Sequence, residues 1–196
     1  MNEFEYYVIG RKGDKPYPLL STHPDSDITR LYIGDDSSIY RGKPIPNPEL
    51  MEFAFSEPFP PKPAIGDYFS HPESVVSKKI ADVLEPMKIK GIQLIPATVE
   101  SNKGDIYEDF FYVYIHHYIE AMDKENSDFE YDEDMYFVDS FYLDEEVLKE
   151  IPLEERLVFK LKEKCSLKLY HRSVVDAIMA TEPEGVQFTA VEDWSF

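Results

Sequence analysis

The clearest alternation of hydrophobic and polar positions lies in residues 166–191. The pattern predicts a strand, a short helix with Ser173 as its N-cap and, after Pro183 and Gly185, a second strand. The hydrophobic positions that carry it are Leu167 and Leu169 for the first strand, Val174, Val175, Ile178 and Met179 for the helix, and Val186, Phe188 and Ala190 for the second strand. These apolar positions indicate a structural unit that packs on a core.

An earlier segment, residues 71–99, resembles this arrangement. Both segments contain Ser-Val-Val (74–76 and 173–175), Glu-Pro where the helix is expected to end (85–86 and 182–183) and Gly-apolar-Gln opening a strand (91–93 and 185–187). The amphipathic stripe expected in the earlier helix consists of Val76, Ile80, Val83, Leu84 and Met87. Two interpretations are open: two helix-turn-strand units that obey the same local rules, or a duplicated ancestral unit.

Elsewhere the pattern predicts further strands at residues 4–9, 29–33, 50–55 and 157–161, and a strand central to a sheet at 110–115. Asp144 is expected to cap a short helix that Pro152 stops. Residues 44–63 hold seven prolines and should be extended, either as an arm laid across the core or as a linker. The fold class is α+β, with a mixed or mostly antiparallel sheet and a few short helices. We expect one domain, residues 1–196, with a β-rich subregion at 1–57 and the core at 58–196.

The composition favours a folded, soluble protein. Of the 196 residues, 43% are hydrophobic and 14% aromatic, and no apolar run reaches the roughly 20 residues that span a bilayer. A single cysteine, Cys165, and the absence of a recognisable secretory signal predict a cytoplasmic location. The net charge of −19 argues against nucleic acid or an anionic membrane as direct partner and is compatible with a basic protein partner. Solubility alone is the alternative explanation of this charge.

Motifs for catalysis or cofactors are absent from the sequence, which contains no nucleophile elbow, phosphate-binding loop or dinucleotide-binding loop. His116, His117 and Glu120 lack the spacing of a metal site, and adjacent histidines in a strand should point to opposite faces, one buried and one exposed. Cys165 has lysines nearby but no context of a catalytic thiol. We therefore expect no catalytic residue, no metal and no cofactor.

Residues 120–150 form an acidic segment, with 13 Asp or Glu residues, two lysines and a net charge of −11. Aromatic side chains alternate with the acids, which is typical of a surface that binds a Lys- or Arg-rich protein. The candidate binding residues are Asp128, Glu130, Tyr131, Asp132, Glu133, Asp134, Tyr136, Asp139, Asp144 and Glu145. A solvated loop with its aromatic residues turned inward is the alternative.

Six short motifs stand out along the chain: Pro-Lys-Pro at 61–63, Asp-Tyr-Phe at 67–69, the run at 74–86, Ala-Met-Asp at 121–123 with Ser127, the run at 170–178, and Gly-Val-Gln-Phe at 185–188. Together they resemble the motifs of a bacterial immunity-protein family, whose members are encoded beside polymorphic toxins. The resemblance covers residues 58 to 191 approximately, and His116 and His117 depart from the family pattern.

The resemblance implies a non-enzymatic antitoxin in interbacterial competition, which binds a cognate toxin domain and protects the cell that makes it. The acidity favours a basic toxin of nuclease type. Two other functions are open: an enzyme that uses carboxylates or the histidine pair, and an acidic adaptor in a secretion apparatus. Whether the protein is monomeric or dimeric is also open.

Overall fold

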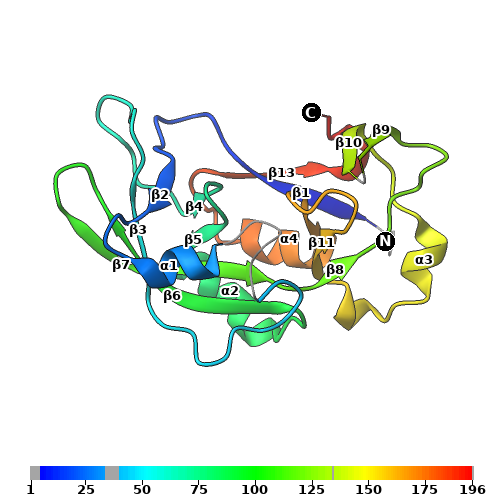
Figure 1. Ribbon diagram of the computed structural model, residues 1–196, viewed down its shortest axis with the longest axis horizontal. Coiled ribbons are helices and arrows are strands. Elements are labelled where there is room, and N and C mark those ends of the chain that lie inside the picture. Colours follow the sequence, from blue (N-terminus) through cyan, green and yellow to red (C-terminus); the bar gives the residue numbers. More distant parts are fainter. Residues whose placement is uncertain (1–4, 34–39, 134, 196) are drawn as a thin grey trace.

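The computed structural model describes residues 5–33, 40–133 and 135–195, which form two large sheets, a two-stranded hairpin and short helices (Figure 1). The α-helices in these ranges are α1 (Asp27–Tyr32), α2 (Lys78–Met87), α3 (Glu145–Lys149) and α4 (Arg172–Met179), and the 3-10 helices are η1 (Leu153–Glu155) and η2 (Val191–Asp193). None of these helices is long and apolar enough to cross a membrane. Mixed sheets with short helices confirm the α+β class.

The larger sheet has the strand order β2-β3-β6-β7-β5-β4. Its strands are β2 (Leu20–Thr22), β3 (Met51–Phe55), β4 (Tyr68–Phe69), β5 (Val75–Ser77), β6 (Ile92–Glu100) and β7 (Ile106–Ile115). The pair β3–β6 is parallel and the other neighbours are antiparallel. The strand predicted at 50–55 is confirmed, and the one predicted at 110–115 lies inside the sheet, as expected.

The smaller sheet has the order β13-β1-β12-β11-β8. Its strands are β1 (Tyr6–Arg11), β8 (Tyr118–Ile119), β11 (Val158–Leu161), β12 (Lys168–His171) and β13 (Val186–Ala190). Only the short pair β8–β11 among its described ladders is parallel. The strands predicted near the start of the chain, at 157–161 and after Gly185 are confirmed.

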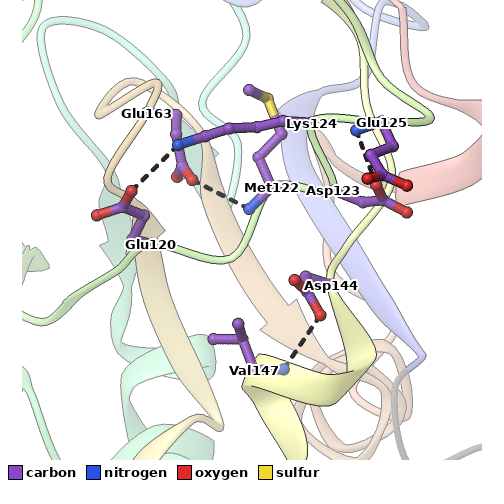
Figure 2. A pocket seen from close by; sticks show the side chains of 8 residues that line it. All are labelled: Glu120, Met122, Asp123, Lys124, Glu125, Asp144, Val147 and Glu163. Carbon is purple, nitrogen blue, oxygen red and sulfur yellow. Dashed lines mark hydrogen bonds and ion pairs between the residues drawn. The ribbon is translucent and has the colours of Figure 1, made fainter.

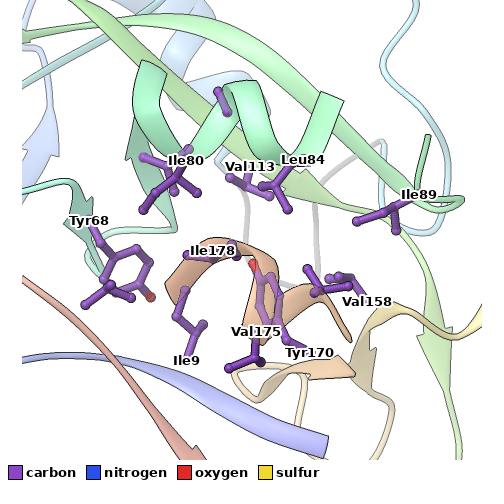
Figure 3. Packing of buried hydrophobic residues seen from close by; sticks show 14 of the residues in the cluster. Ile9, Tyr68, Ile80, Leu84, Ile89, Val113, Val158, Tyr170, Val175 and Ile178 are labelled. Carbon is purple, nitrogen blue, oxygen red and sulfur yellow. The ribbon is translucent and has the colours of Figure 1, made fainter. Parts of the chain in front are cut away.

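Helices α2 and α4 lie side by side and fill the space between the two sheets (Figure 3). Ile80 and Leu84 of α2 meet Val175 and Ile178 of α4 in one buried cluster, to which Val113 of β7 and Val158 of β11 also belong. Burying each of these aliphatic side chains stabilises the fold by about 1.5–3 kcal/mol. The two sheets therefore share a core.

The smaller sheet is buried on its other face as well. Tyr6 and Val8 of β1 and Phe159 of β11 belong to a second cluster, together with Phe141 and Leu148 from the acidic segment. Neighbouring residues on these strands point into opposite clusters, because side chains alternate along a strand. The acidic segment is thus anchored on this sheet.

A buried ion triad also joins the two sheets. Glu73, just before β5, pairs with Lys160 of β11 at 3.1 Å and with Lys168 of β12 at 2.5 Å. Burial acts to raise the pKa of Glu73, but the two lysines outweigh it and hold that pKa below its usual value. The ionised carboxylate is therefore part of the folded structure.

The strand predicted at residues 29–33 is wrong, because this stretch is helical in α1. The hydroxyl of Ser26 accepts a hydrogen bond from the amide of Thr29 at 3.3 Å and caps the helix. Asp27 and Arg30 stand in the first and last turns, where their charges suit the helix dipole. Local capping thus overrides the β-forming preference of the side chains.

The two helix-turn-strand segments are less alike than their motifs. Residues 74–76 of the first Ser-Val-Val lead into strand β5, so Val76 is not on the helix, whereas residues 173–175 are inside α4. The Glu-Pro pair at 85–86 does mark the end of the first helix, since α2 ends at Met87, one residue after Pro86. His171, not Ser173, caps α4, since its ring accepts from the amide of Ser173. Met179 is 43% exposed and does not belong to the buried stripe.

The proline-rich stretch behaves as an arm rather than a linker. Ile45 is 1% exposed, and its backbone exchanges two hydrogen bonds with the side-chain amide of Gln93 on β6, at 2.7 and 3.0 Å. The stretch then continues into β3. It is therefore laid on the larger sheet.

Candidate functional site

Part of the acidic segment folds into a separate hairpin, β9 (Asp128–Asp132) and β10 (Met135–Ser140), at one end of the molecule (Figure 1). The register pairs Asp132 with Met135, Tyr131 with Tyr136, Glu130 with Phe137, and Phe129 with Val138. Successive pairs face opposite sides of the hairpin. The hairpin therefore has two faces of different chemistry.

The inner face holds the hairpin to the protein. Val138 is 1% exposed and joins the second buried cluster, while the rings of Phe129 and Tyr136 pack 5.4 Å apart beside it. The ammonium group of Lys124 lies 5.2 Å from the centre of the Tyr136 ring, a cation–π contact.

The outer face combines exposed acids with exposed apolar side chains. It consists of Asp128, Glu130, Asp132, Met135 and Phe137, which we call the outer hairpin face. Met135 is 54% exposed and Phe137 is 51% exposed. In the part of the chain that the structure describes, none of the three carboxylates forms an ion pair. Large exposed apolar side chains within a polar rim are typical of protein-binding surfaces.

The base of the hairpin is fixed by backbone contacts. Met122 and Leu143 form an isolated bridge, and the amide of Asp144 donates to the carbonyl of Ala121 at 2.9 Å. The side chain of Asp144 accepts hydrogen bonds from the amides of Glu146 and Val147, which confirms its predicted capping role. The hairpin thus projects from a rigid frame.

The candidate residues named from the sequence fall into different positions. Those with exposed side chains are Asp128, Glu130, Tyr131, Asp132, Glu133, Asp139 and Glu145. Tyr136 is half-buried on the inner face, Asp144 is engaged in capping α3, and Asp134 lies outside the described residues. The aromatic side chains point both ways, with Tyr131 and Phe137 exposed and Phe129 and Tyr136 half-buried.

Met135 and Phe137 are not among the candidate residues named from the sequence, although Phe137 is one of the aromatic residues interleaved with the acids. The available signal was the period of two, which places them on the same face as the acids once the hairpin turn is located.

Next to the hairpin lies a pocket of about 640 Å³ (Figure 2). Its lining consists of Glu120, Met122, Asp123, Lys124, Glu125, Asp144, Val147 and Glu163. Five of these side chains are carboxylates and one is a lysine, so the pocket is strongly acidic.

Glu163, which lies in the turn between β11 and β12, is the buried acid of this pocket, with 8% exposure. Its Oε1 atom accepts a hydrogen bond from the amide of Met122 at 3.1 Å. Its Oε2 atom is buried and has no hydrogen-bond partner among the described residues. The neighbouring Glu120 differs, because hydrogen bonds from Lys162 at 2.9 Å and Lys124 at 3.2 Å satisfy it and lower its pKa. Sequence reasoning also missed Glu163, which lies outside the acidic segment.

The candidate catalytic groups contact other residues in the part of the chain that the structure describes. The thiol of Cys165 is 3.1 Å from a guanidinium nitrogen of Arg41. His116 and His117 follow the end of β7 and are both half-buried, so the expected division into one buried and one exposed ring is wrong. Burial lowers the pKa of His116, and the nearby His117 adds to that effect. Within the described ranges, no group of three or more His, Cys, Asp or Glu side chains is placed to hold a metal ion.

An acidic α+β chain with an anchored hairpin, exposed on one face, is a scaffold suited to binding another protein. The chain belongs to a family of immunity proteins. The matching model is that of the Immunity protein family (Imm11), and the match covers residues 11–193. It therefore includes most of the N-terminal third, beyond the resemblance seen in the sequence. A comparison with curated proteins gave no match.

Proposed function

We propose that the chain neutralises its cognate toxin by stoichiometric binding, without catalysis, and that the outer hairpin face forms part of the contact. One observation carries this proposal: three carboxylates that form no ion pair with other described residues and two half-exposed apolar side chains occupy one face of a hairpin, which Val138, Phe129 and Tyr136 of the other face hold to the core.

The charge supports a basic toxin domain as the partner. Of the net charge of −19, −11 resides in residues 120–150, the segment that contains the hairpin. A concentrated negative field accelerates encounter with a cationic protein. Nucleases bind an anionic substrate through cationic surfaces, and a toxin of this class would present the complementary charge. The encounter would take place in the cytoplasm of the protected cell.

The apolar side chains supply the part of the affinity that charge does not. Exposed charges at an interface rim mainly set the association rate, whereas buried anchors set the lifetime of the complex. Phe137 is the aromatic anchor of the outer hairpin face, and Met135 beside it is flexible enough to fit an irregular surface.

The test is a titration of the toxin domain encoded by the neighbouring gene with the purified chain. We expect a complex that co-elutes in size-exclusion chromatography and toxin activity that falls to zero at one molar equivalent. Separate elution with full toxin activity would contradict the proposal. Neutralisation by a small fraction of an equivalent would also contradict it, because that result requires turnover.

A further inference from the structure

We propose that the acidic pocket beside the hairpin receives a basic side chain, arginine or lysine, from the partner. The identification of that partner as a toxin domain rests on the function proposed above. The pocket itself is argued from Glu163, from Lys124 and from the continuity of the pocket with the hairpin.

One carboxylate oxygen of the buried Glu163 accepts no hydrogen bond from the described residues. A buried carboxylate needs hydrogen bonds to both oxygens, since removal from water is costly when it is not compensated. The amide of Met122 serves Oε1, but Oε2 has no partner among the described residues. A cationic N–H group entering the pocket would supply the missing hydrogen bond and neutralise the charge.

The pocket already holds one ammonium group, that of Lys124. Figure 2 shows its side chain reaching across the pocket to Glu120, with which it pairs at 3.2 Å. This lysine is 42% exposed and has two contacts: the ion pair with Glu120, which is weak because it is exposed, and the cation–π contact with Tyr136. Lys124 thus occupies the place that a stronger cation could take.

Arginine is the better occupant of the two candidates. Its planar guanidinium group has five N–H donors, so one group can serve Glu120 and the free oxygen of Glu163 together. Five carboxylates and Lys124 line the pocket, and Lys162 also pairs with Glu120, so the acids still outnumber the cations and a further positive charge can be accommodated.

The pocket is continuous with the outer hairpin face. A second pocket, of about 400 Å³, shares Glu120 and Glu163 with the first and is lined by Met135 and Tyr136 of the hairpin. Cys165 and three basic side chains, those of Arg41, Lys162 and Lys164, complete its lining, so the acidic site is the first pocket. A protein that covers Met135 and Phe137 can therefore reach Glu163 with a neighbouring side chain.

The first experiment needs no toxin. N-acetyl-arginine amide is titrated into the full chain, and the backbone amide of Met122 is followed by NMR. We expect a saturable shift in the millimolar range and none with N-acetyl-citrulline amide, which has the same shape without the charge. Glu163→Gln should abolish the saturable shift. Lys124→Met should tighten the binding several-fold, whereas Lys103→Met, which removes an exposed lysine in the β6–β7 turn, should leave it unchanged. If the Met122 amide signal does not shift with the arginine compound, or shifts equally with the citrulline compound, the proposal that the pocket binds a basic side chain is wrong.

The second experiment measures the toxin complex. Glu163→Gln should weaken binding at least about tenfold, mainly through faster dissociation, because a buried charge pair is lost. If Glu163→Gln folds poorly, the affinity of Lys124→Met for the toxin domain provides an independent test. This variant should bind the toxin at least as tightly as the wild type. A folded Glu163→Gln variant with unchanged affinity overturns the pocket and leaves the proposed function standing. Arginine binding without any toxin binding overturns the proposed function and leaves the pocket standing.

Discussion

Reversal of Asp128, Glu130 and Asp132 to lysine probes the part of the outer hairpin face that would steer a basic toxin. The three side chains are exposed and form no ion pair with other described residues, so the change in the free energy of unfolding should stay within about 0.5 kcal/mol. The formal net charge changes from −19 to −13. The association rate with the toxin domain should fall, and the size of the fall should depend on salt.

The expected size follows from Coulomb's law. Two opposite charges about 7 Å apart in water attract by about 0.6 kcal/mol, which screening reduces to about 0.5 kcal/mol at 0.01 M salt and about 0.25 kcal/mol at 0.15 M. Replacing attraction by repulsion doubles each value, and three sites together give about 3 and about 1.5 kcal/mol respectively. Association should therefore slow about 100-fold at low salt and about tenfold at 0.15 M salt.

Stopped-flow mixing at both salt concentrations measures these rates. The matched control reverses Glu49, Glu52 and Glu108, which are exposed acids at the larger sheet, away from the hairpin, and gives the same net charge. We expect the control to slow association much less. If both triple variants slow it equally, net charge rather than the hairpin guides the encounter. If the hairpin variant associates at the wild-type rate, the outer hairpin face is not in the contact.

Three further variants test the anchor and the frame. Phe137→Ala should weaken toxin binding by about 2 kcal/mol, or about 30-fold in Kd by titration calorimetry, whereas Ile106→Ala, which removes a similarly exposed side chain from β7, should leave Kd unchanged. Glu73→Gln leaves two buried lysines without their carboxylate and should lower the free energy of unfolding by about 3–5 kcal/mol in urea titrations. Because the pKa of Glu73 is lowered, the stability it contributes is present above pH 4.5 and is lost as pH falls below that value, a dependence that the variant should lack; an unchanged pH profile would refute this. Gly91→Ala should cost more than about 1 kcal/mol, because Gly91 has φ +81° and a Cβ there would lie 2.2 Å from the Cβ of His117; wild-type stability would contradict the described geometry.

Strands with strong periodicity could be predicted from the sequence. The apolar positions of these strands face buried clusters, and this burial is visible in the sequence as alternation or as a high content of β-branched and aromatic residues. The strands concerned are those predicted at 110–115, at 157–161 and after Gly185. The stretch 29–33 was misread because one hydroxyl, on Ser26, provides a helix start that outweighs β propensity.

The candidate site could be predicted only in part. The charge and aromatic content of residues 120–150 indicated a binding segment, but which side chains face outward depends on the pairing of β9 with β10. Glu163 was beyond reach, because its role depends on a contact with Met122, 41 positions away in the chain. Local pattern carries no information on contacts of that separation.

Hydrogen exchange of the chain with and without the toxin domain tests the central claim most directly. Binding should slow exchange at the backbone amides of β9 and β10 and of residues 121–125, and leave those of α1 and β3 unchanged. The opposite result, protection confined to the larger sheet while the hairpin exchanges at its free rate, would contradict the proposal that this acidic hairpin and its pocket hold the toxin.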